Sequence, residues 1–117
     1  MRYQSFATGK DFRFNDTAWL GADGIYSTHA YTTRAIDIIN RHDPDVPLFL
    51  FLSFQAPHTP ITAPLRYTEN FKNVHFPTRR IYLGMVNALD EAVGNITNVL
   101  FKKGMNKNML LVFTSDV

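Results

Sequence analysis

The chain has 117 residues, of which 45% are hydrophobic, enough for the core of one domain. Its net charge is only +2 without a long run of like charge, which argues against binding to nucleic acid or to an anionic membrane surface. Cysteine is absent and no apolar run is long enough to span a bilayer, so disulfides, thiolate metal sites and a membrane span are excluded within this stretch.

Residues 1–26 are rich in glycine, aspartate, asparagine and aromatic residues, without a sustained period. They predict irregular loops with, at most, a short hairpin. A helical pattern follows, for which Ser27 or Thr28 is a suitable N-cap and which Asp43-Pro44 ends. The apolar residues of this predicted helix share one face and are Tyr31, Ala35, Ile36 and Ile39.

The next segment, Pro47 to Phe54, is apolar nearly throughout and lies between turn-forming residues. This pattern predicts a strand that is covered on both faces, as in the centre of a parallel sheet. The loop after this strand contains Pro57, Pro60 and Pro64, which fix a path that is neither helix nor strand.

A long helix is predicted to begin with Thr78 as its cap and to end at Gly104. Its apolar stripe comprises Tyr82, Val86, Leu89, Val93, Ile96 and Leu100. Its opposite face comprises Arg80, Asn87, Glu91, Asn95, Asn98 and Lys102. A second buried strand is predicted from Met109 to Asp116, so the two strands and the helix form a right-handed βαβ unit. The fold class is therefore α/β, with parallel strands and crossover helices in one unit over residues 1–117.

Ligands of open parallel sheets gather at the carboxyl ends of the strands. His58 follows the first strand by four residues, and Asp116 ends the second strand. If the strands are neighbours, both side chains reach one rim, where a histidine could bind an anion or pass a proton and a carboxylate could ligate a hard cation. The alternatives are an ordinary hydrogen-bonding histidine and a turn-forming aspartate.

Other candidate sites have less support from the sequence. His29, His42 and His75 make no metal-ligand spacing with one another. The adjacent carboxylates Asp90 and Glu91 diverge by about 100° on a helix, which favours a solvated flank over a shared substrate atom. Motifs for nucleotide binding, zinc proteolysis and a serine nucleophile elbow are absent.

Two sequons, at Asn15 and Asn95, permit N-glycosylation in a secretory compartment. Asn95 falls on the helix face opposite the predicted apolar stripe. We therefore expect its side chain to be accessible.

Several stretches of the chain resemble the sulfatase family, most closely its arylsulfatase B, I and J branch. They are STHAYTTRAI in the first helix, PLFL leading into QAPHTP, LDEAVGNIT in the long helix and MLLVFTSD at the end. The resemblance implies part of an alkaline-phosphatase-like α/β sandwich that hydrolyses sulfate esters of sugars or aryl groups. It also implies a lysosomal or secreted protein, although this stretch contains no signal peptide.

The resemblance assigns roles to two residues. His58 in QAPHTP matches the family's sulfate-contacting histidine, and Asp116 matches the first residue of its late calcium-binding Asp-Asn pair. A calcium ion and a formylglycine nucleophile are therefore implied cofactors. The [CS]xPxR motif that yields formylglycine, the remaining calcium-binding aspartates and the sulfate-binding lysines lie outside this stretch, so we expect an internal fragment that is inactive alone.

Position 117 departs from the family pattern, because Val117 stands where the family has asparagine and an alkyl side chain cannot coordinate a cation. A diverged pseudoenzyme and an incomplete gene model, in which a splice-donor sequence was read as valine, both account for it. Two alternative functions therefore stay open. One is a non-catalytic pseudosulfatase that binds glycans, and the other is a phosphoester hydrolase of the same superfamily.

Overall fold

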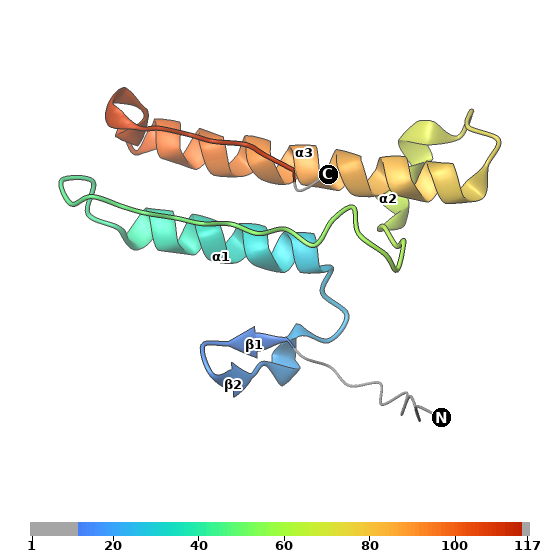
Figure 1. Ribbon diagram of the computed structural model, residues 1–117, viewed down its shortest axis with the longest axis horizontal. Coiled ribbons are helices and arrows are strands. Elements are labelled where there is room, and N and C mark those ends of the chain that lie inside the picture. The colour runs from blue at the N-terminus through green and yellow to red at the C-terminus, as the bar shows by residue number, and fades with distance from the viewer. Residues whose placement is uncertain (1–11, 116–117) are drawn as a thin grey trace, which may run out of the picture.

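A computed structural model describes residues 12–115, and two long helices lie side by side at its centre (Figure 1). They are α1, Ser27–Arg41, and α3, Pro77–Lys102. The shorter helical elements are η1, Leu20–Ala22; α2, Leu65–Thr68; η2, Glu69–Phe71; and η3, Met105–Asn108. Strands β1, Arg13–Phe14, and β2, Thr17–Ala18, form an antiparallel hairpin, which confirms the short hairpin allowed for this part of the chain.

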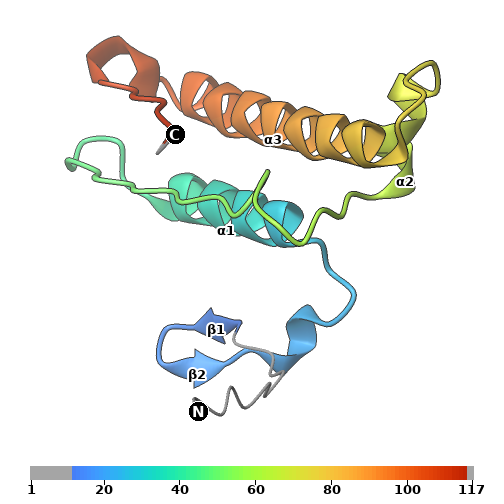
Figure 2. The ribbon, with the colours of Figure 1, turned by 45° about the vertical axis from the view of Figure 1, so that its right-hand side comes forward.

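The direction of the chain follows the α/β pattern. Figure 1 shows α1 and α3 running the same way, and each is followed by an extended segment that returns alongside it, residues 47–54 and residues 109–115. Figure 2 shows the same order from a second side. The two extended segments therefore run in a common direction, as strands joined by a crossover helix do.

The predicted buried strands are not formed, because neither extended segment is paired in a sheet within residues 12–115. Residues 47–54 instead alternate: Leu48, Leu50, Leu52 and Phe54 pack on the core, whereas Phe49 is 90% and Phe51 79% exposed. Residues 109–113 are exposed throughout. A strand is buried on both faces only when neighbouring strands and a second layer cover it, and the described residues supply neither.

The helices begin earlier than predicted. Pro77 is the first residue of α3 and Phe76 its N-cap, so Thr78 lies inside the helix and does not cap it. Proline suits this first position because its missing N–H has no intrahelical acceptor there and its φ is already helical. Likewise Tyr26 is the N-cap of α1, without a side-chain hydrogen bond. The predicted end of α3 is confirmed, since Gly104 adopts a left-handed φ of 71° directly after the C-cap Lys103.

The buried row of α3 is offset from the predicted stripe. Ile96 and Leu100 are buried as expected, but Val86 is 39% exposed. The buried residues of α3 are Gly84, Met85, Ala88, Ala92, Ile96 and Leu100. Half of this row is glycine or alanine, and these small residues allow α1 and α2 to approach α3 closely. Hydrophobicity alone points to larger residues, so the predicted stripe agrees with the buried row only at Ile96 and Leu100.

Ile39 and Ala35 of α1 and Ile96 and Leu100 of α3 form the central apolar cluster. Lys103 binds the C-terminal end of α1 next to this cluster. Its Nζ donates hydrogen bonds to the carbonyl oxygens of Ile39 at 2.9 Å, Asn40 at 2.9 Å and His42 at 2.5 Å. The Ile39 carbonyl also accepts a longer bond from the His42 backbone N–H at 3.3 Å, and the ammonium group adds to this capping and offsets the negative end of the helix dipole. No helix in residues 12–115 is long and apolar enough to cross a membrane.

Two glycines of α3 provide a matched test of this packing. A Cβ added at Gly84 would lie 2.8 Å from Thr68 Cγ2 and 3.2 Å from Ala63 Cβ, whereas a Cβ at Gly94 would meet nothing within 4 Å. We expect Gly84→Ala to lower the free energy of unfolding by about 1 kcal/mol, because overpacking exceeds the helix-propensity gain. Gly94→Ala should raise it by about 0.5–1 kcal/mol. Thermal unfolding of the purified variants would show shifts of opposite sign, and shifts of the same sign would contradict the close approach.

Candidate functional site

His58 is exposed on the loop between residues 47–54 and α2, where its backbone and ring are both held. Its N–H donates to the Gln55 carbonyl oxygen at 2.8 Å, and its Nδ1 lies 2.6 Å from the Thr59 carbonyl oxygen. Since a carbonyl oxygen can only accept, Nδ1 must carry a proton. Nε2 makes no hydrogen bond to residues 12–115 and is therefore presented to solvent, as a lone pair in the neutral ring or as an N–H donor in the cation.

Asp116, the predicted partner of His58 in a metal and anion site, lies outside the described residues. Their placement at one rim therefore stays a prediction. Residues 12–115 contain no cluster of three or more histidine, cysteine or carboxylate side chains that could hold a metal ion.

A polar network connects three helices near the N-terminal end of α1, the end opposite Lys103. It consists of His29 from α1, Arg66 and Tyr67 from α2, and Glu91 from α3, and we call it the tyrosine network. Tyr67 is only 3% exposed and donates its phenolic proton to Glu91 Oε1 at 2.8 Å. Arg66 Nη2 contacts the same carboxylate oxygen at 2.9 Å and also the Tyr67 hydroxyl.

The network holds Tyr67 in its protonated form. His29 Nε2 lies 2.8 Å from Tyr67 Oη and 3.3 Å from Arg66 Nη2, and its role as donor or acceptor is set by the tautomer of the ring. The pKa of Tyr67 is raised above its ordinary value by burial first and by the hydrogen bond and charge of Glu91 second, while Arg66 opposes the shift. The phenol therefore stays neutral at physiological pH and keeps its hydrogen bond to Glu91.

The sequence did not reveal this network. Glu91 is exposed, as a solvated flank predicts, but its carboxylate is also paired with Arg66 and Tyr67. His29 carried no motif. The four residues are separated by as much as 62 positions (91 − 29), and no local period relates them. Only the packing of α2 across α1 and α3 brings them together.

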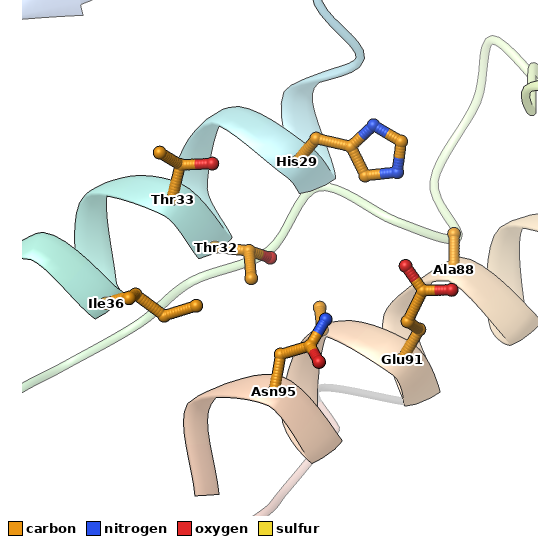
Figure 3. A pocket seen from close by; sticks show the side chains of 8 residues that line it. His29, Thr32, Thr33, Ile36, Ala88, Glu91 and Asn95 are labelled. Atoms are coloured by element: carbon orange, nitrogen blue, oxygen red, sulfur yellow. The ribbon is translucent and has the colours of Figure 1, made fainter. Parts of the chain in front are cut away.

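A polar groove lies between α1 and α3 next to the tyrosine network. Its volume is about 210 Å³. The residues that line it are His29, Thr32, Thr33, Ile36, Ala88, Glu91, Ala92 and Asn95. Figure 3 shows Asn95 and Glu91 one turn apart on α3, opposite the threonines of α1. We call this space the α1–α3 groove.

The two sequons occupy different surroundings. Asn15 is exposed at the two-residue turn between β1 and β2, with a φ of 53° that asparagine tolerates better than most residues. Asn95 is exposed as predicted, but it also lines the α1–α3 groove. Accessibility was expected for Asn95 alone, and occupancy of both sequons stays a prediction.

The sequence model of the Sulfatase family matches residues 2–116. Mouse arylsulfatase J is 42% identical over 109 residues, which cover 92% of this chain and 18% of that protein. Mouse N-acetylgalactosamine-6-sulfatase is 32% identical over 90 residues, 76% of this chain and 16% of its own. The chain thus spans less than a fifth of the length of these relatives.

Two solved structures are similar in fold. The crystal structure of Ps i-CgsB is 34% identical to this chain with a TM-score of 0.63, covering 71% of this chain and 19% of that one. Ps i-CgsB in complex with k-i-k-neocarrahexaose is 32% identical with a TM-score of 0.66 and the same coverage. The arrangement of helices and extended segments therefore recurs within larger proteins.

Removal of the Tyr67 hydroxyl oxygen tests how much the tyrosine network contributes to stability. Tyr67→Phe should lower the free energy of unfolding by about 1–3 kcal/mol, because His29 and Glu91 lose a buried partner. Tyr82→Phe is the matched control, since the Tyr82 hydroxyl makes no hydrogen bond to the described residues. Urea unfolding of both variants at neutral pH measures the difference. Equal midpoints would show that the network adds nothing to stability.

The raised pKa of Tyr67 also sets a pH dependence. The folded protein holds this proton more tightly than the unfolded chain, so the contribution is fully present below the ordinary tyrosine pKa of about 10 and is lost as pH rises through the raised value. Stability between pH 9 and 11, the test range, should therefore fall more steeply in the unmodified protein than in Tyr67→Phe. Parallel curves would contradict the assignment.

Proposed function

The chain belongs to the sulfatase family of sulfuric ester hydrolases, and on that premise we propose that the complete protein hydrolyses sulfate esters of sugars or aryl groups. The family match over residues 2–116 carries this proposal. The relatives described above are named as sulfatases, and one structural neighbour is complexed with an oligosaccharide. We further propose that this chain forms part of one alkaline-phosphatase-like catalytic domain, since two extended segments run in the same direction beside two helices.

His58 is the residue of this chain that we assign to the reaction. Because the Thr59 carbonyl oxygen holds the Nδ1 proton, the Nε2 atom is directed outward and can meet a sulfate oxygen or the ester oxygen that departs. As an N–H donor it would offset negative charge that develops on that oxygen. The same atom can then transfer its proton to the leaving group. His58 is thus proposed both to bind sulfate and to act in catalysis.

Calcium and formylglycine are the groups that the family implies. Asp116 offers the carboxylate oxygen that calcium prefers, whereas Val117 offers no ligand atom. The described residues contain no further cluster of metal ligands, so this chain would supply one side chain to the ion. When bound, calcium would offset the charge of the sulfate. The chain contains no cysteine and no [CS]xPxR motif, so the nucleophile lies elsewhere and the chain alone should be inactive.

The accessible sequons support a lysosomal or secreted location. Both Asn15 and Asn95 are exposed, as a glycosylation site must be. We propose that both can be modified, with Asn95 treated in more detail below. Val117 supports the second candidate function, a pseudosulfatase that binds sulfated glycans without turnover, because the substitution removes a metal ligand.

The role of His58 is tested by substitution in the complete protein. We expect His58→Ala to lower turnover of 4-nitrocatechol sulfate by about a hundredfold or more, as loss of one preorganised transition-state contact does. His75→Ala is the matched control, because His75 is also an exposed loop histidine but lies outside the proposed site. His58→Gln separates the two roles, since an amide can donate a hydrogen bond near Nε2 but cannot transfer a proton. An unchanged rate in His58→Ala would remove His58 from the site.

The calcium proposal is tested by binding rather than by activity. Isothermal titration of the metal-free complete protein with calcium should show one site, and Asp116→Ala should weaken it, because one anionic ligand is lost. Asp90→Ala is a suitable control, as this exposed carboxylate lies within α3. A protein that binds no calcium would favour the pseudosulfatase over the hydrolase.

A further inference from the structure

Two independent features of the chain meet at Asn95. The sequence Asn95-Ile96-Thr97 is a sequon, and the same asparagine lines the α1–α3 groove. Figure 3 shows its side chain directed from α3 into the space between the helices, near Glu91. A sugar attached to Asn95 would therefore start at the mouth of a preformed hollow.

The lining of the groove suits an N-acetylated sugar. The tyrosine network uses Oε1 of Glu91, and the other oxygen, Oε2, makes no hydrogen bond to residues 12–115 and can accept one from a sugar hydroxyl. The Thr33 hydroxyl on the opposite wall is likewise without a partner among the residues described. Ile36, Ala88 and Ala92 add apolar surface for the acetamide methyl and the ring carbons.

Asn95 and Glu91 are also correctly spaced for a shared ligand. They are four residues apart on α3, so their side chains lie on the same helix face, one turn from each other. The groove volume of about 210 Å³ leaves space for one hexose-sized group rather than for a branched oligosaccharide. The outer sugars would have to extend into solvent.

We propose that Asn95 carries an N-linked glycan whose first N-acetylglucosamine lies in the α1–α3 groove and bridges the two helices. This inference rests on the secretory location proposed above. The modification forms a bond between Asn95 Nδ2 and C1 of the sugar, Nδ2 loses one proton, and the diphosphate of a lipid-linked donor departs. Nothing is oxidised or reduced in this transfer. The seated sugar fills the groove beside the tyrosine network and adds contacts between α1 and α3.

Asn15 serves as an internal control for this inference. It carries the other sequon, but it is exposed on the β1–β2 turn and does not line the α1–α3 groove. A glycan on Asn15 would project into solvent and add no contact between α1 and α3. The two sites thus share their chemistry and differ in what surrounds the first sugar.

The experiment uses the complete protein secreted from a eukaryotic host, both as the parent and in an Asn15→Gln background that leaves Asn95 as the one sequon of residues 1–117. Glycan occupancy at Asn95 is measured by peptide mass spectrometry. One sample is trimmed with endoglycosidase H, which leaves the first sugar, and another lacks the glycan because of Thr97→Ala. Trimming should leave the Tm unchanged, whereas Thr97→Ala should lower it by about 2 °C or more. Thr97→Ser keeps the sequon and should behave as the parent.

Each outcome bears on a separate statement. In the parent protein that keeps Asn15, a glycosylated Asn15 beside a sugar-free Asn95 would overturn the inference, and so would an equal Tm with and without the Asn95 glycan. A fall in Tm on trimming alone would show that outer sugars, and not the seated one, stabilise the helices. Absence of sugar at both sequons of the parent protein would contradict the secretory location itself. Sulfatase activity enters none of these readouts, so loss of turnover leaves the inference standing.

Discussion

The close approach of α1, α2 and α3 is the constraint on which the described structure depends. Glycine and alanine occupy much of the buried row of α3, and Gly84 in particular leaves space for Thr68 of α2. Interiors are packed densely, so such a contact cannot be widened by one methyl group without cost. Because α2 sits this close, its Tyr67 reaches both neighbouring helices. The apolar packing and the polar network are therefore parts of the same contact.

This packing buries the phenol of Tyr67, and the tyrosine network supplies its hydrogen-bond partners. A buried phenol needs a hydrogen-bond partner, and Glu91 accepts its proton while His29 Nε2 lies 2.8 Å from its oxygen. The exposed guanidinium of Arg66 offsets the negative charge of the Glu91 carboxylate. The carboxylate remains partly solvated, which limits the cost of desolvating its charge. Three helices are thereby oriented by directional bonds, whereas apolar contacts alone would allow them to slide.

The sequence predicted those features that depend on neighbouring residues in the chain. The end of α3 at Gly104 and the burial of Ile39 and Leu100 follow from backbone preference and from period. Glu91 could not be predicted as a network member, because its partners come from other helices. Whether residues 47–54 pair in a sheet could not be predicted from this segment alone either, because pairing requires neighbouring strands. For the site, the loop position of His58 was predictable, whereas the bond from its ring to Thr59 was not.

The alternating exposure of residues 47–54 leaves an apolar edge that can associate with other chains until the rest of the protein covers it. One side of this segment is tied to the helices, while Phe49 and Phe51 point outward beside backbone groups that are not paired in a sheet. An extended apolar edge of this kind is a template on which other chains add as strands. Residues 109–113 present a second such surface. Until both are covered, self-association competes with folding, and molecular chaperones that mask apolar segments would favour the productive route.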